Sequence, residues 1–255
     1  MGGNMFPGTQ SINKRYIKAT TESLFNEHLI ICGVPKYKFI GSTGKANVSS
    51  DIDLCIGCSP SNKKMLTEKL EKRLGKSNVK ISGQNIAVKY HIVGFEQAYV
   101  QIDLMLAEKH KLDDIAWLMS GDSHQGIKGV YRNLMISMLA KKKSEKMSPD
   151  KKITVSFPGG LAYKTQNGKN WKDDGPRETS PTKILKAVGI NENPDNIVTF
   201  SQLVDFMTKD SVLCKHLGDF PDYINSYILK SPESANRALW YIRTKMRIMN
   251  EQETN

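Results

Sequence analysis

The sequence predicts a protein of the α+β class, with a mixed β-sheet that carries helices on one face and a mainly helical region after it. Three observations predict this class. In the first 107 residues, a segment with helical spacing of apolar residues is followed by strands, a second helical segment and further strands. The last 75 residues show helical spacing in several stretches. With 255 residues, of which 39% are hydrophobic, the chain can bury a sizeable core.

Helices and strands alternate in the N-terminal part. The expected helices cover residues 11–32 and 59–74, and each is followed by a glycine that ends it, Gly33 and Gly75. β-forming residues in short apolar runs indicate the strands. The expected strands are one entering at Phe39 and Ile40, one carrying Asp51 to Leu54, and three more at residues 78–82, 85–93 and 98–107.

The C-terminal part shows a different pattern of predicted elements. A helix is expected over residues 130–140 and an extended segment over 153–163, while the Asn, Gly, Lys and Asp content of residues 165–180 indicates a linker or mobile loop. Ser180 and Pro181 are a typical helix start. The predicted domains are therefore a catalytic unit at 1–140, a basic segment and mobile loop at 141–180, and a helical accessory region at 181–255.

The charge balance indicates a polyanionic partner. The chain has 37 basic and 26 acidic residues, a net charge of +11, and its isoelectric point is near 9.4. Eight basic residues against two acidic ones fall between Lys128 and Lys152, which marks this segment as the first surface to test for nucleic-acid contact. Surface lysines that serve solubility alone are the other interpretation.

We expect a cytoplasmic protein, or one of the host cytoplasm if the chain is viral. No run approaches the ~18 apolar residues of a membrane span, so no membrane partner is expected. The N-terminal residues lack the charged flank and apolar core of a secretory signal. The four cysteines are too few and scattered for a disulfide framework.

Three carboxylates are the most informative feature. Asp51 and Asp53 lie two residues apart in a strand, so both side chains point to one face while Ile52 and Leu54 point to the other. Asp103 lies inside another apolar strand, where a charged residue needs a partner. Like charges held this close repel unless a cation lies between them, and paired carboxylates suit Mg²⁺. The three acids could hold two ions.

The Gly41-Ser42 turn, the Asp51-x-Asp53 pair and Asp103 on a later strand together resemble the signature of the DNA polymerase β-like nucleotidyltransferase superfamily. In that superfamily the glycine-serine turn lies at the start of a helix. The likeness covers roughly residues 36–107. The N-terminal Gly-Gly-Asn-x-Phe and the Gly-Ser-Thr-Gly-Lys form of the turn are similar to those of uncharacterised bacteriophage members.

The resemblance implies the transfer of a nucleoside monophosphate from a nucleoside triphosphate such as ATP to a hydroxyl acceptor, with release of pyrophosphate. Asp51 and Asp53 would ligate two Mg²⁺ ions, or Mn²⁺ in their place, and Asp103 would complete one metal site and could take the acceptor's proton. The terminal phosphates would be held by the turn, through Ser42 and the amides near Gly41 and Gly44. Lys45 either adds positive charge there or is a solvated surface lysine.

A basic loop after the third acid is a further candidate. Lys128 and Arg132 could meet the triphosphate or the acceptor strand, and Tyr131 could stack on a base. The alternative is a packed tyrosine beside two exposed cations. A nucleic acid is the preferred acceptor, but a small-molecule acceptor and a non-catalytic nucleic-acid-binding or virion-associated protein that kept the fold stay open. Neither the nucleotide, the number of additions nor the oligomeric state follows from the sequence.

Overall fold

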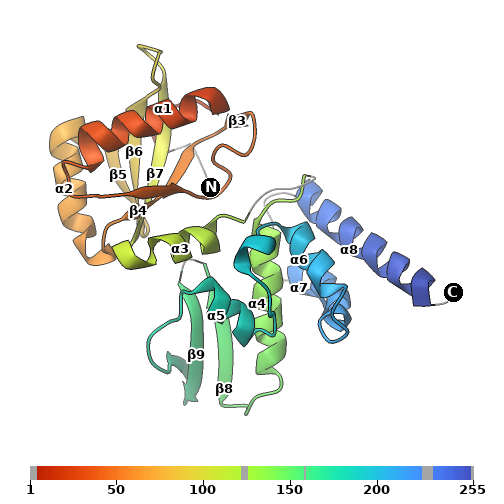
Figure 1. The fold of residues 1–255 in the computed structure, drawn as a ribbon. Coiled ribbons are helices and arrows are strands. Elements are labelled where there is room, and N and C mark those ends of the chain that lie inside the picture. Colours follow the sequence, from red (N-terminus) through yellow and green to blue (C-terminus); the bar gives the residue numbers. More distant parts are fainter. Residues whose placement is uncertain (1–4, 122–125, 158, 226–231, 254–255) are drawn as a thin grey trace. The chain divides into compact units, whose positions relative to one another are not determined.

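The computed structural model describes residues 5–121, 126–157, 159–225 and 232–253 (Figure 1). The chain divides into two compact units, residues 1–116 and residues 117–255. The boundary that we expected near residue 140 falls inside helix α4 (Val130–Ser144), and this whole helix belongs to the second unit. The bacteriophage-like Gly2, Gly3 and Asn4 lie outside the described residues.

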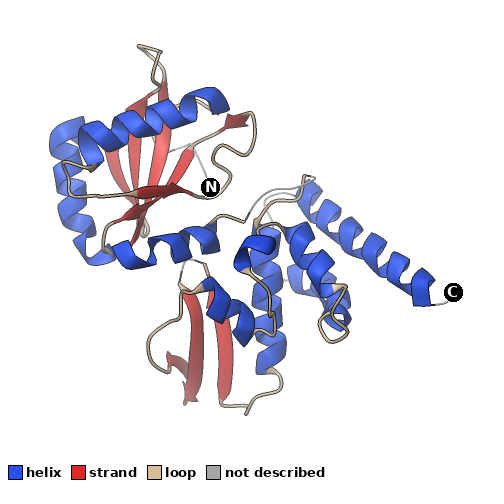
Figure 2. Cartoon of the chain, viewed as in Figure 1, coloured by secondary structure: helices blue, strands red, loops and turns tan. Residues whose placement is uncertain are grey.

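A five-stranded mixed sheet forms the centre of the first unit, as predicted. Its strand order is β2-β4-β7-β6-β5, in which β4 and β7 are parallel and the other neighbours are antiparallel (Figures 1 and 2). A separate two-stranded sheet pairs β1 with β3. The strands are β1 (Ile12–Asn13), β2 (Tyr37–Phe39), β3 (Val48–Ser49), β4 (Ile52–Gly57), β5 (Val79–Ser82), β6 (Asn85–His91) and β7 (Tyr99–Ala107).

Two helices, α1 (Lys14–Leu24) and α2 (Lys63–Leu74), cover one face of this sheet. Asn13 caps α1 by accepting the Arg15 N–H at 3.1 Å, and the helix continues in a π-helical segment, Phe25–Leu29. Gly75 ends α2 with a φ of 89°. Both helices bury their apolar sides against the alternate strand residues that point towards them, so the acids of β4 and β7 point to the opposite face. The buried set includes Ile17, Leu24, Leu66, Leu70, Ile52, Leu54, Ile102 and Leu104.

Helices and a second antiparallel sheet make up the other unit. The sheet has the order β10-β9-β8, so the linker or mobile loop that we predicted from residue 165 is wrong as far as residue 173. Helix α4 packs on β8, where Ser144 Oγ donates to Ile153 O and accepts the Ile153 N–H. The strands are β8 (Lys151–Ser156), β9 (Gly160–Asn167) and β10 (Asn170–Asp173).

The chain after residue 180 is mainly helical, as predicted. Its helices are α5 (Pro181–Ala187), α6 (Phe200–Met207), α7 (Phe220–Asn225) and α8 (Pro232–Glu253). Earlier in the chain, helix α3 (Leu112–Met119) lies between β7 and α4. Thr199 and Gln202 form a capping box that starts α6.

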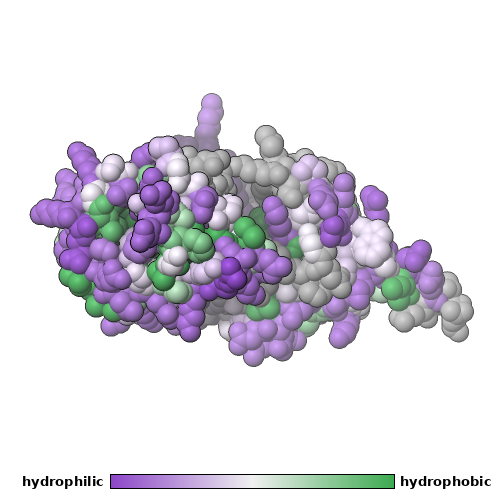
Figure 3. Space-filling model, turned by 90° about the horizontal axis from the view of Figure 1, so that it is seen from above, coloured by the Kyte–Doolittle hydropathy of each residue, from purple (hydrophilic) through white to green (hydrophobic). Residues whose placement is uncertain are grey.

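Hydrophilic residues dominate the surface in the view of Figure 3, and apolar atoms occur there in small separate groups. No described helix is both long enough and apolar enough to cross a membrane.

Candidate metal centre

The parallel pairing of β4 and β7 brings two of the predicted acids together. The register places Asp53 opposite Asp103, with Ile52 opposite Ile102 and Leu54 opposite Leu104. The apolar neighbours are fully buried in the core. Because side chains alternate across a strand, both carboxylates must then point to the face that α1 and α2 leave uncovered.

Asp51 completes the group. It lies two residues before Asp53, immediately before β4, and only 6% of its surface is exposed. Ser50 Oγ donates a hydrogen bond to its Oδ1 at 3.0 Å. One carboxylate oxygen from each of Asp51, Asp53 and Asp103 lies within 4.8 Å of the others, and in the described part of the chain this is the one such group of three potential metal ligands.

The surroundings of Asp53 and Asp103 disfavour the charged forms of these two acids. Burial, then the neighbouring carboxylates of Asp51 and Asp103, raise the pKa of Asp53 to about 7. Burial also raises the pKa of Asp103, opposed by a hydrogen bond from Gln101 and reinforced by the Asp51 carboxylate. A bound cation would remove both penalties, because it replaces lost hydration and offsets the repulsion.

The donor chemistry fits a hard divalent ion. Carboxylate oxygens are the ligands that Mg²⁺ and Mn²⁺ prefer. Asp51, Asp53 and Asp103 could therefore hold a metal ion, as we predicted from their spacing.

The predicted turn at Gly41 and Ser42 lies next to the three carboxylates. Residues 41–45 form consecutive turns, and Gly41 has a φ of 62°, which favours glycine. A Cβ atom on Gly41 would lie 2.6 Å from Asp53 Oδ2. The glycine thus lets the backbone approach the carboxylate in a way that a larger residue would prevent.

Thr43 joins the turn to β4, a role that we did not predict. The Asp53 N–H donates to Thr43 Oγ1 at 2.7 Å, and the Ile40 N–H donates to Asp53 O at 3.1 Å. Thr43 is 5% exposed. A buried hydroxyl therefore fixes the backbone of Asp53, and in the sequence only its position between Gly41 and Gly44 hinted at this.

The remaining turn residues are exposed or only partly buried. Ser42 is exposed, whereas Gly44 and Lys45 are partly buried. The Lys45 N–H donates to Ser42 O at 3.2 Å, and the Thr43 N–H donates to Ile40 O at 3.4 Å. No helix follows the turn, which differs from the turn at a helix start in the superfamily that the sequence resembles.

Replacing Gly41 by Ala is expected to weaken metal binding at least tenfold, because the new methyl group would displace the Asp53 carboxylate. Gly44→Ala is the matched control: its φ of 70° imposes similar backbone strain, but its Cβ would meet no described heavy atom within 4 Å. Isothermal titration of both variants with Mn²⁺ measures the difference. Equal affinities would show that the contact with Asp53 does not matter.

Gln101 is a second residue that we did not predict. Its Nε2 donates to Asp103 Oδ1 at 2.9 Å, and its Oε1 accepts the Met5 N–H at 2.9 Å. The side chain is 2% exposed. Gln101 therefore holds Asp103 in position and ties the N-terminal segment to β7. A polar residue two positions before Asp103, on the same face of an apolar strand, was the available signal.

Arg132 requires a correction. We predicted that it meets a nucleotide, but its guanidinium is fully buried. It donates to Trp117 O at 2.7 Å and to Val198 O at 3.4 Å, and it lies 4.1 Å from the centre of the Trp117 ring. Tyr131 is also buried and packs against Phe200. Of the two interpretations of this residue, the packed tyrosine is therefore the correct one.

Lys128 keeps an exposed side chain, and its backbone N–H donates to Ser234 Oγ at 2.8 Å. It belongs, like Arg132, to the second unit, whereas the three acids and the turn belong to the first. A nucleotide contact by Lys128 stays a prediction.

No protein-family model and no curated protein matches this chain.

Proposed function

We propose that the chain is a Mg²⁺-dependent nucleotidyltransferase that moves a nucleoside monophosphate from a nucleoside triphosphate to a hydroxyl group, with nucleic acid as the preferred acceptor. The observation that carries this proposal is the convergence of three carboxylates within 4.8 Å. Asp53 and Asp103 lie on two parallel strands, Asp51 lies immediately before the first of these strands, and Gly41 in the adjacent turn leaves no room for a side chain next to Asp53. The net charge of +11 supports polyanionic substrates.

Each acid has an assigned role. Asp51 and Asp53 would hold the divalent ions, and Asp103 would share in that ligation from the neighbouring strand. When bound, the ions would neutralise phosphate charge and bring the triphosphate and the hydroxyl together. An oxygen of Asp103 would accept the proton of the hydroxyl, and Gln101 would keep that carboxylate oriented.

The turn is proposed to contact the triphosphate. The Ser42 hydroxyl is exposed, and the N–H groups of Ser42 and Gly44 make no hydrogen bond to the described part of the chain. Free amides in a turn can bind anionic oxygens. The side chain of Lys45 could add positive charge.

Metal binding is expected to weaken about tenfold when the pH falls from 8 to 6. Asp53 must lose its proton to bind a cation, and its pKa in the folded protein is raised from 3.8 to about 7. Calorimetric titration with Mg²⁺ at both pH values measures this change. An unchanged affinity would exclude Asp53 from the metal site.

The effect of pH on the stability of the metal-free protein has the opposite direction: a lower pH stabilises the fold. The folded chain holds this proton more tightly than the unfolded chain does, so the stabilising contribution is complete below pH 3.8 and is lost as the pH rises through about 7.

A labelling experiment tests the function. Wild-type protein, Mg²⁺ and each labelled nucleoside triphosphate are incubated with RNA, DNA or small hydroxyl compounds. We expect label on the nucleic acid, lost in Asp103→Asn and kept in Glu68→Gln, which removes an exposed charge from the same unit. Label that persists in Asp103→Asn would contradict the proposal. Nucleic-acid binding without label from any nucleotide would favour the non-catalytic alternative.

A further inference from the structure

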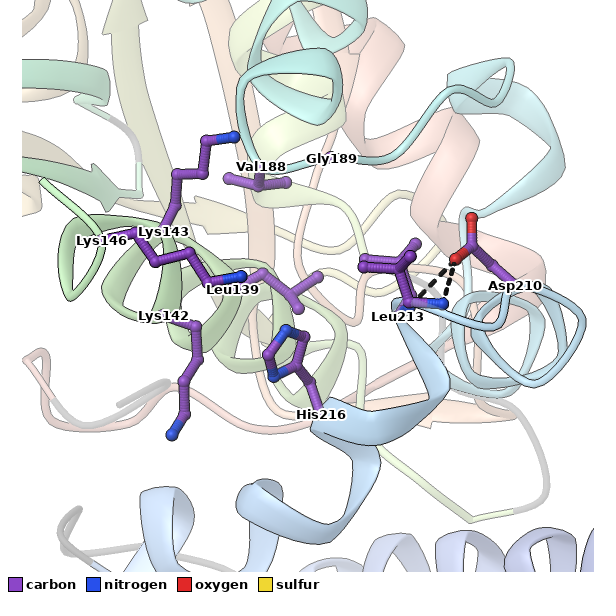
Figure 4. Close-up of a pocket in the computed structure, with 10 residues that line it drawn as sticks. Leu139, Lys142, Lys143, Lys146, Val188, Gly189, Asp210, Leu213 and His216 are labelled. Carbon is purple, nitrogen blue, oxygen red and sulfur yellow. Dashed lines mark hydrogen bonds between the residues drawn. The ribbon is translucent and has the colours of Figure 1, made fainter.

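A separate cavity of about 260 Å³ lies within the second unit, between the end of α4, the end of α5 and the segment after α6 (Figure 4). Part of its wall is apolar and part is basic. The apolar part is Leu139, Val188, Val212 and Leu213, and the basic part is Lys142, Lys143, Lys146 and His216. The three lysines belong to the basic segment that the sequence marked for nucleic-acid contact.

Two of the charged side chains around the cavity, those of Lys142 and Asp210, already have partners within the protein. Lys142 Nζ lies 3.3 Å from Asp219 Oδ1 and 3.5 Å from Glu145 Oε2. The Asp210 carboxylate accepts the N–H groups of Val212 and Leu213 at 2.9 and 3.0 Å, which ties it to its own turn (Figure 4).

The other two ammonium groups are not matched. Within the described residues, neither Lys143 nor Lys146 has an ion pair or a side-chain hydrogen bond. Figure 4 shows their side chains extending to the apolar wall, towards Val188 and Leu139. The ring of His216 lies next to Leu139, away from Lys143, and its Nδ1 is 3.3 Å from Asp219 Oδ2.

We propose that this cavity binds the phosphate group of a single nucleotide unit, either a free nucleotide or the 5′ end of a nucleic-acid strand. Lysine ammonium groups bind phosphate as point charges, and two unmatched ones in a concave site attract a multiply charged anion. The apolar wall would take the sugar or base, as in ligand sites that combine apolar surface with a few polar groups. The volume of about 260 Å³ is just below the range of typical ligand pockets, which favours a single unit over several.

The site neither contains nor needs the three acids, so its test is run without metal. The full chain is titrated in EDTA with AMP, adenosine, inorganic phosphate and a 5′-phosphorylated hexanucleotide. Lys143→Ala/Lys146→Ala is compared with Lys169→Ala/Lys172→Ala, which removes two exposed lysines from the same unit. Circular dichroism verifies that both variants are folded.

We expect wild type and the control to bind AMP equally, the Lys143→Ala/Lys146→Ala variant to bind it at least tenfold more weakly, and adenosine to bind at least tenfold more weakly than AMP. Tighter binding of AMP than of the hexanucleotide would identify the free nucleotide as the ligand, and the reverse would identify the strand end. Equal binding of AMP by both double variants would overturn the proposal. Phosphate that binds as tightly as AMP would overturn the nucleotide assignment. Because metal is absent, neither result bears on the transferase proposal.

Discussion

Replacing Asp53 by Asn is expected to abolish the proposed transfer and, at the same time, to stabilise the metal-free protein. Activity should fall by about 10³-fold, because the central ligand for the divalent ions is lost. Stability at pH 8 should rise by about 1–3 kcal/mol, because the neutral amide removes a buried charge whose pKa is raised to about 7 by burial and by Asp51 and Asp103. Transfer assays and urea unfolding in EDTA measure the two effects.

The combination of the two effects distinguishes a functional acid from a structural one. If the Asp53 carboxylate mainly supported the fold, this substitution would lower the stability of the protein. Glu68→Gln, an exposed charge change on α2, should alter neither quantity. If Asp53→Asn destabilises the metal-free chain, the three acids do not repel one another as their geometry requires.

Replacing Arg132 by Ala is expected to destabilise the second unit by about 3–5 kcal/mol. The substitution removes a fully buried cation and leaves Trp117 O and the Asn133 side chain without their donors. It also removes the contact with the face of the Trp117 ring. Urea unfolding followed by far-ultraviolet circular dichroism measures the loss.

Lys128→Ala serves as the control, because this exposed lysine lies just before the helix that carries Arg132. It should leave the unfolding midpoint unchanged. A folded Arg132→Ala variant of unchanged stability that loses only nucleotide binding would restore the contact that we first predicted for Arg132.

Much of the first unit could be predicted from the sequence, because period-two and helical patterns are local. The alternation of Ile52 and Leu54 with Asp51 and Asp53 placed the acids on the face of the sheet opposite the helices, and the strand around Asp103 was equally clear. The direct pairing of Asp53 with Asp103 could not be predicted, since it depends on the parallel register of two strands far apart in the sequence.

The errors have a common physical origin. We took Arg132 to be a surface cation. It is buried through hydrogen bonds to Trp117 O and Val198 O, and no local sequence pattern indicates contacts between residues so far apart in the chain. Residues 165–173 were taken as a loop because their polar composition suits one, whereas pairing of β9 with β8 and β10 imposes strands on them. Thr43 and Gln101 act through side-chain hydrogen bonds to particular partners, and such bonds produce no periodic pattern in the sequence.

The most direct test of the central claim is Mn²⁺ binding measured by electron paramagnetic resonance on wild type and on Asp51→Asn, Asp53→Asn, Asp103→Asn and Glu68→Gln. We expect wild type and Glu68→Gln to bind Mn²⁺ with the same affinity, and we expect each Asp→Asn change to weaken binding at least tenfold. Equal affinity in wild type and in all three Asp→Asn variants would contradict this claim.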